Sequence, residues 1–200
     1  MATTETLDTD ESATPAREQL QRAFNRFDEL VHRVPAGAWD DASPCEGWTV
    51  RDVLAHMTSE HLWAPRLLAG ETIEAVGDDY DGDVLGDDPV AAWDSAASGS
   101  REAWANADDA TTVHLSFGDT PAGEYAEQVL LDLTVHAWDL GVGAGLDVDA
   151  GVVPEAVLHV LGYARSSGMV GRSPFGPEVT TSSDDPQAQL VALLGRTPAA

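Results

Sequence analysis

The most informative stretches of this sequence are SPCEGWTVRDVLAHM, residues Ser43–Met57, and LLDLTVHAWDLGVGAG, residues Leu130–Gly145. In the first stretch, Thr49 followed three residues later by Asp52 predicts a capping box, at the start of a helix that runs to about Ala69. In the second stretch, apolar side chains recur every three or four residues until a run of glycines ends the pattern. Both stretches are therefore expected to be amphipathic helices with one face in a protein core.

Further helix starts are marked by proline, which is favoured in the first turn of a helix. These starts are Thr14–Pro15, Asp88–Pro89, Thr120–Pro121, Pro154 and Asp185–Pro186. The first of these helices is expected to end before Pro35 and the last at Gly195, whereas residues 71–88 are expected to form an acidic loop. Apolar and polar residues alternate over Thr111–Phe117, which predicts a short strand or an extended loop. The sequence thus predicts an all-α fold, a helical bundle with one short extended segment.

The composition is strongly acidic: 200 residues carry 35 Asp and Glu against 10 Arg and no Lys, a net charge of −25. Such a chain lacks the basic cluster that binds nucleic acid, and anionic membranes repel it. The single Cys excludes an internal disulfide and multi-cysteine zinc or iron–sulfur sites. Apolar residues make up 43% of the chain, which is enough for a sizeable core. The sequence shows neither a secretory signal nor a membrane span. We therefore expect a soluble cytoplasmic protein with one domain at 14–200, preceded by a disordered acidic tail at 1–13.

Two histidines, His56 and His136, fall on the apolar faces of predicted helices. Asp132 precedes His136 by four residues, so both side chains lie on one face of the same helix. A carboxylate on an apolar face needs a partner or a metal, because burying an unpaired charge is costly. Together with His56 from a facing helix, these residues supply three ligands to a divalent cation and leave a position for water or substrate. The alternative is a charge pair between Asp132 and His136 without a metal.

Other side chains have two interpretations each. Glu60 lies one turn after His56. It is either a hydrogen-bond acceptor or base beside the site, or a carboxylate at the helix edge with no role in it. In the first interpretation it is our one candidate catalytic residue. Cys45 is either a thiol activated by the following helix or a buried side chain. Asp139 is expected to face away from Asp132 and to be structural. Three arginines are candidate contacts for an acidic cofactor, Arg51, Arg66 and Arg165.

The two stretches also carry a family resemblance. The first resembles the second-helix motif of DinB-like proteins and, more closely, the metal-binding domain of mycothiol-dependent maleylpyruvate isomerases. The second resembles the other metal-ligand helix of that group. The segments FGPEV from Phe175 and LLGRTP from Leu193 are similar to the end of a short, mostly actinobacterial subgroup that is described as metal-binding. The resemblance covers nearly the whole chain after residue 14, and it implies a DinB-like four-helix bundle with extra short helices.

The resemblance implies that His56, Asp132 and His136 are metal ligands, with Asp132 in place of the Glu that the isomerase has. The default ion for two histidines and one carboxylate is Zn²⁺, and Ni²⁺ or Fe²⁺ also suit the set. A low-molecular-weight thiol such as mycothiol is the implied cofactor. The isomerase has a further C-terminal domain at its active site, whereas this chain ends at Ala200. We therefore do not expect maleylpyruvate isomerisation.

The function predicted from these residues and the resemblance is that of a metal- and thiol-dependent transferase that acts on small electrophiles. The alternatives are a non-enzymatic metal-binding or stress-response protein and a metal-dependent hydrolase that uses the same ligands. The expected partners are a small-molecule substrate or thiol, with neither nucleic acid nor membrane. The resemblance also allows for a homodimer.

Overall fold

The computed structural model describes residues 15–149, 152–168, 170–171 and 175–198. The expected acidic tail at 1–13 and the expected cap Thr14 lie outside these residues. Within the described part, the chain forms seven helices and one two-stranded hairpin: α1 (Pro15–Val31), α2 (Val50–Leu68), α3 (Ile73–Val76), α4 (Pro89–Asn106), β1 (Thr112–Leu115), β2 (Gly118–Pro121), α5 (Ala122–Gly143), α6 (Pro154–Ser167) and α7 (Pro186–Leu193). This architecture confirms the all-α prediction. No helix among the described residues is long and apolar enough to span a membrane.

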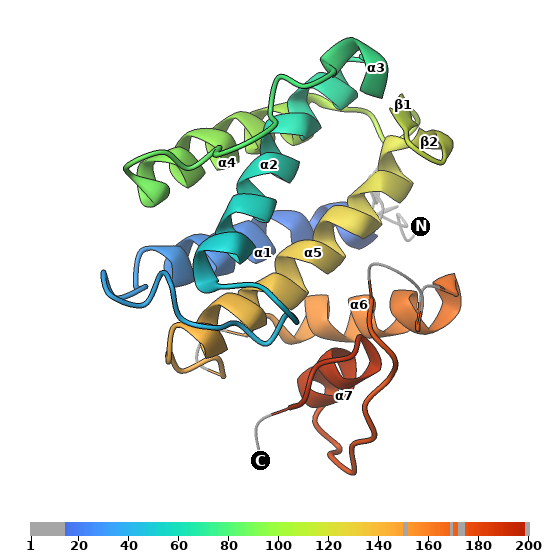
Figure 1. Ribbon diagram of the computed structural model, residues 1–200. Coiled ribbons are helices and arrows are strands. Elements are labelled where there is room, and N and C mark those ends of the chain that lie inside the picture. The colour runs from blue at the N-terminus through green and yellow to red at the C-terminus, as the bar shows by residue number, and fades with distance from the viewer. Residues whose placement is uncertain (1–14, 150–151, 169, 172–174, 199–200) are drawn as a thin grey trace, which may run out of the picture.

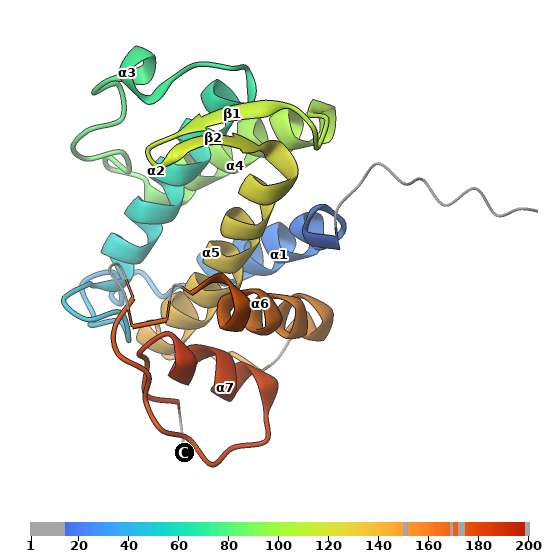
Figure 2. The same ribbon diagram turned by 90° about the vertical axis from the view of Figure 1, so that its right-hand side faces the viewer.

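The core of the fold is a bundle of α1, α2, α4 and α5 (Figure 1). In this bundle α2 packs against both α4 and α5, and α1 packs mainly against α5. Figure 2 shows α6 and α7 at the end of the molecule away from the hairpin, where α6 contacts α1, α5 and α7. Large apolar side chains from all four bundle helices are fully buried, among them Phe24, Phe27, Leu54, Met57, Trp93, Leu130 and Leu133. The packing of α2 against α5 is what positions the site described below.

The N-terminus of α2 is stabilised by the predicted capping box. The side chain of Thr49 accepts a hydrogen bond from the backbone N–H of Asp52, and the carboxylate of Asp52 accepts one from the N–H of Thr49. These two bonds satisfy amide donors that the first turn of a helix leaves without partners. After the last turn, Gly70 has a φ of 87°, a left-handed conformation that glycine adopts without strain. The sequence signals at both ends of α2 are therefore confirmed.

Two helix boundaries differ from the prediction. Helix α1 ends at Val31 rather than Val34, because the chain tightens there into turns whose N–H groups bond to carbonyls three residues back. Helix α5 begins at Ala122, and Thr120 does not cap it. The hydroxyl of Thr120 instead donates to the carbonyl of Gly118 at 3.2 Å, within the hairpin.

The extended segment predicted at Thr111–Phe117 is one strand of a hairpin. Strand β1 pairs antiparallel with β2, and Leu115 lies opposite Gly118 next to the turn. The second strand, GDTP, was not predicted because it contains Gly, Asp and Pro, all disfavoured in strands, and lacks apolar alternation. The turn leaves Phe117 with 68% of its surface exposed. The acidic loop expected at 71–88 likewise contains the one-turn helix α3.

Candidate metal centre

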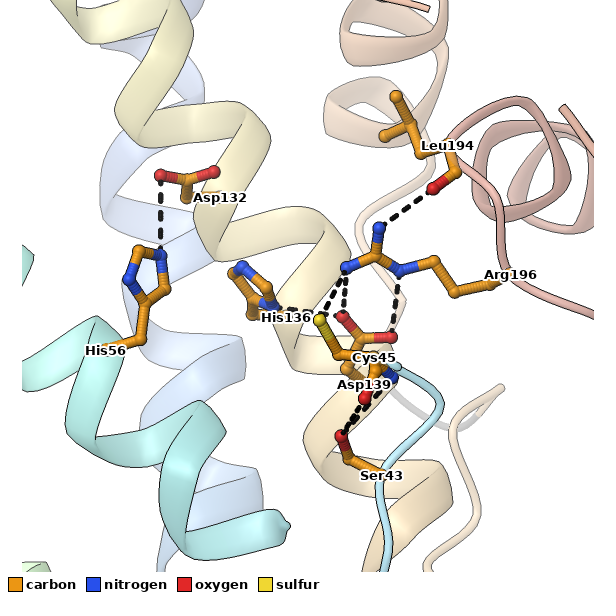
Figure 3. A network of polar contacts seen from close by, with 8 residues as sticks. All are labelled: Ser43, Cys45, His56, Asp132, His136, Asp139, Leu194 and Arg196. Atoms are coloured by element: carbon orange, nitrogen blue, oxygen red, sulfur yellow. Dashed lines mark hydrogen bonds and ion pairs between the residues drawn. The ribbon is translucent and has the colours of Figure 1, made fainter. Parts of the chain in front are cut away.

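The structure brings together the three residues that the sequence singled out. His56 lies on α2, and Asp132 and His136 lie one turn apart on α5 (Figure 3). The Nε2 atom of His56 is 4.0 Å from Oδ2 of Asp132, and one potential ligand atom from each residue lies within 4.8 Å of the other two. A distance of 4.0 Å is too long for a hydrogen bond, so the ring and the carboxylate face each other without a direct bond. The three donor groups therefore converge on a common point between α2 and α5.

The cluster lies at the rim of the core. The side chains of His56 and Asp132 are each 28% exposed, whereas that of His136 is 9% exposed. The expectation that Asp132 would be buried was therefore wrong in degree. The positions of α2 that lie fully in the core include Leu54 and Met57, and His56 lies at the edge of that buried face. This partial exposure leaves the side chains of His56 and Asp132 in contact with solvent.

The ring of His136 is oriented by Asp139 on the next turn of α5. The Nδ1 atom of His136 is 2.9 Å from Oδ2 of Asp139, whose side chain is completely buried. Because an ionised carboxylate only accepts hydrogen bonds, Nδ1 carries the proton and Nε2 keeps its lone pair. This carboxylate–imidazole arrangement accompanies most metal-ligating histidines. Asp139 was interpreted as structural only, although its spacing of three residues from His136 was a signal that the two side chains meet.

Asp139 is held in turn by Arg196, which follows α7 in the chain. The Nη2 and Nε atoms of Arg196 donate to the two oxygens of Asp139 at 2.8 and 3.2 Å, a two-pronged contact. Arg196 also donates through Nη1 to the carbonyl of Leu194 at 2.9 Å. The three arginines named from the sequence as possible cofactor contacts have other partners: Arg51 contacts Asp83 and Gly86, Arg66 contacts Glu71 and Asp79, and Arg165 contacts Gln189.

Two side chains that precede α2 border the cluster. The ring of Trp48 packs on both imidazoles, with centroids 5.2 Å from His56 and 5.9 Å from His136. Cys45 is half-buried, and its Sγ lies 3.5 Å from Nη2 of Arg196. Burial raises the pKa of the Cys45 thiol, although Arg196 opposes the shift. Cys45 is therefore a packed thiol beside the network, and the helix terminus does not activate it.

The electrostatics of the cluster follow from its low solvation. Burial lowers the pKa of His56 to about 4, and the neighbouring His136 ring adds to this shift when it is protonated. Burial raises the pKa of Asp132, although His136 and Arg196 oppose that shift. Burial acts in the same direction on Asp139, but hydrogen bonds from His136 and Arg196 outweigh it and hold the pKa of Asp139 below its usual range. At neutral pH the cluster thus offers a neutral His56 ring whose lone pair is available to a cation.

Glu60 lies beside the cluster, on the next turn of α2. Burial and the charge of Asp132 raise its pKa to about 7. The hydrogen-bond acceptor for the ring of His136 is Asp139. Glu60 instead lines a cleft of about 260 Å³ that it shares with Trp63 and Tyr125.

The other histidines are engaged elsewhere. Each has a polar contact outside the cluster: His32 with Asp94, His61 with Ser100, His114 with Asp119 and His159 with Glu127. His61 is fully buried, with Nδ1 3.0 Å from Oγ of Ser100. Of the six histidines, only His56 and His136 belong to the cluster.

The fold and the site together define a class of protein, a helical bundle in which two of its helices bring two histidines and one carboxylate to a common point. The chain belongs to the family of the mycothiol maleylpyruvate isomerase N-terminal domain, whose family model matches residues 20–141. The matched region includes α2 and nearly all of α5, and therefore all three residues of the cluster. The family resemblance inferred from the sequence is thus confirmed.

Relatives of this chain occur in Mycobacterium tuberculosis. Two proteins described only as uncharacterized, one from strain CDC 1551 / Oshkosh and one from strain ATCC 25618 / H37Rv, are each 30% identical to it over 185 residues. The alignments cover 88% of this chain and 95% of each relative. No solved structure matches the chain.

Proposed function

We propose that His56, Asp132 and His136 hold a divalent cation and that the protein transfers a low-molecular-weight thiol of the mycothiol type to a small electrophile. The observation that carries this proposal is the convergence of the three donor groups within 4.8 Å of one another. Zn²⁺ is the first expectation for the ion, and Ni²⁺ or Fe²⁺ suit the same donors. The thiol is suggested by the description of the family, which names mycothiol.

The donor set fits such an ion. A tetrahedral ion with ligand bonds of about 2.1 Å places its donor atoms about 3.4 Å apart. The separations here, 4.0 Å for His56 and Asp132 and at most 4.8 Å overall, are within a small side-chain adjustment of that geometry. Three protein ligands leave a coordination position open. The set therefore has the composition of a catalytic rather than a closed structural site.

The ion would supply one chemical effect: it would lower the pKa of a coordinated thiol, so that the thiolate predominates at neutral pH. The protein supplies the rest. Asp139 holds the His136 ring in position, and Trp48 covers both imidazoles on one side. In a transfer, a bond forms between the thiol sulfur and an electrophilic carbon, and a leaving group departs with its bonding electrons. The carboxylate of Glu60 is the candidate acceptor for the proton that the thiol gives up.

The metal is tested by measuring Zn²⁺ affinity in competition with a chromophoric chelator. Replacing His56 or His136 by Ala should weaken binding by more than about 100-fold, the upper end of what losing an outer partner of a metal site costs. The matched control is His32→Ala, because His32 is a half-exposed histidine outside the cluster. Equal Zn²⁺ affinity in all of these variants would overturn the proposed site.

The thiol is tested on cobalt-substituted protein, whose visible absorption reports the ligands of the ion. Mycothiol should change these bands, and the same addition to the cobalt-treated His56→Ala variant should not. A spectrum that mycothiol, bacillithiol and γ-glutamylcysteine all leave unchanged would refute thiol binding. That outcome would leave the non-enzymatic and hydrolytic alternatives as the functions compatible with a bound metal.

A further inference from the structure

A second feature, a cleft of about 260 Å³, lies next to the cluster. Its walls come from α2, from the hairpin turn and from the first half of α5, and they include Trp63, Leu115 and Phe117. A volume near 300 Å³ is at the small end of the range for ligand pockets. The cleft therefore suits a small molecule.

The cleft begins one helical turn from the cluster on both helices that form it. Glu60 follows His56 by four residues on α2, and Gln128 precedes Asp132 by four residues on α5. Four residues of α-helix span about 6 Å. A molecule in the cleft would thus have one end beside Glu60 and next to the proposed ion, and its other end under the hairpin turn.

The cleft contains a buried hydroxyl without a partner. Tyr125 is 4% exposed and lines the cleft, and its Oη makes no hydrogen bond to any residue that the structure describes. Leaving such a group unsatisfied costs about 1–3 kcal/mol, so a buried hydroxyl normally has an acceptor. Burial raises the pKa of the Tyr125 hydroxyl, and the charges of Glu60 and Asp132 raise it further. Tyr125 is therefore a protonated donor at the wall of the cleft, and a ligand reaches its buried Oη once the neighbouring side chains shift.

The lining disfavours anions. Glu60 has the single carboxyl group among the described residues that line the cleft, and no Arg or His is present there. Most of the remaining lining is aromatic or aliphatic. A carboxylate ligand would meet a carboxylate with no cation to balance it, in a chain of net charge −25.

From these observations we infer that the cleft binds the electrophilic substrate of the proposed transfer, an uncharged molecule with a flat apolar body and an oxygen that accepts a hydrogen bond from Tyr125. The apolar body lies between Trp63 and Phe117, and the oxygen points toward the cluster. This assignment of a substrate class rests on the proposed function, but the binding itself does not require the ion or the thiol. It can therefore be tested separately.

The test is a ligand-observed NMR titration of metal-free and of Zn²⁺-loaded protein with acetophenone and with benzoate. The pH is set above 7, the approximate pKa of Glu60, so that its carboxyl is ionised. Acetophenone should bind both forms with a dissociation constant on the order of 1 mM, as small ligands of this size do. Benzoate should bind at least about tenfold more weakly than acetophenone. In the Glu60→Gln variant this difference in affinity should become smaller, because the carboxylate that repels benzoate is removed.

Two variants test the assigned contacts. Tyr125→Phe removes only the hydroxyl and should weaken acetophenone binding about tenfold, as expected for one buried hydrogen bond. Its unfolding temperature should equal or exceed that of the wild type, because the lost hydroxyl has no partner within the described protein. Phe117→Ala should also weaken binding. The matched control is Leu158→Ala, which removes the other large apolar side chain that is exposed in the described structure and should leave binding unchanged.

The inference is overturned if acetophenone does not bind, if benzoate binds equally well, or if Tyr125→Phe and Phe117→Ala bind acetophenone as the wild type does. A marked drop in the stability of Tyr125→Phe would also overturn it, because the hydroxyl would then serve the fold. If the wild-type protein binds acetophenone but does not bind Zn²⁺, the proposed function is refuted, whereas the assignment of the cleft as a binding site is not.

Discussion

The contact between Asp139 and Arg196 leads to a prediction in which variants change the free energy of unfolding and the metal affinity differently. Both side chains are nearly excluded from water, at 0% and 7% exposure, and two hydrogen bonds join them. Replacing Asp139 by Leu leaves the guanidinium of Arg196 buried without its carboxylate. Breaking a buried pair in this way costs about 3–5 kcal/mol. Arg196→Met should cost a similar amount, because Asp139 then keeps only His136 as a partner.

The double variant Asp139→Leu with Arg196→Met should behave differently. It removes both charges and fills their space with apolar groups, an exchange that is often close to neutral. We expect its unfolding free energy to lie within about 2 kcal/mol of the wild type, far from the sum of the two single losses. Urea unfolding of metal-free protein measures this, since a bound ion would add its own stabilisation.

The order of the same variants by Zn²⁺ affinity should differ from their order by unfolding free energy. Arg196→Met keeps the bond from Asp139 to His136, so its affinity should stay near that of the wild type. Both variants that lack Asp139 should lose about 10- to 100-fold in affinity, because His136 is no longer oriented. The matched control is Arg22→Ala, which breaks a surface ion pair with Glu155 and should change stability by less than about 1 kcal/mol.

Two results would refute this reasoning. If the double variant loses as much stability as the two single variants together, Asp139 and Arg196 do not form the buried pair. If the double variant regains wild-type Zn²⁺ affinity, Asp139 acts on the fold and does not position His136.

Three further predictions concern other parts of the molecule. Because burial lowers the pKa of His61 from 6.5 to about 3, the unfolded chain binds a proton that the folded chain does not. The free energy of unfolding should therefore be highest above pH 6.5 and fall below that pH. In the His61→Leu variant, the decrease between pH 7 and pH 5 measured by urea unfolding should be smaller by about 2 kcal/mol. Gly143→Ala would place a Cβ 2.9 Å from Cγ2 of Val50, and a destabilisation of about 1–3 kcal/mol is expected in the same assay. Unchanged stability there would mean that α5 and the start of α2 are not in close contact. Asp132→Ala should abolish the rise in unfolding temperature that Zn²⁺ produces in the wild type, and a preserved rise would argue that Asp132 is not a ligand.

Local signals predicted the helices well because the forces that start and stop a helix act over a few residues. The capping box at Thr49 and the prolines after Asp88 and Asp185 each marked a true helix start. Prediction failed where distant contacts decide. Strand β2 forms through its pairing with β1, and nothing in GDTP favours a strand by itself.

In the candidate site, too, local features were predictable from the sequence and contacts between distant residues were not. That Asp132 and His136 share a face follows from their spacing of four residues on one helix. The apolar face of a second helix marked His56 as the third donor, and the family resemblance then implied the same three ligands. The partner of Asp139 was beyond such reasoning, because Arg196 is 57 residues away in the chain and follows α7, which packs on α6. The sequence indicates Asp139 as a neighbour of His136 but contains no sign of which cation neutralises it.

The sequence alone was sufficient for the class of fold, for the position of α2 and α5 and for the three groups that form the cluster, because helix periodicity and capping are local. Only the tertiary structure established that the cluster lies at the rim of the core and that Arg196 fixes Asp139. It also established that Tyr125 lines a cleft one turn away and that its buried hydroxyl has no partner among the described residues. Burial and the partners of polar groups depend on which helices pack against which, and that depends on contacts between residues far apart in the chain.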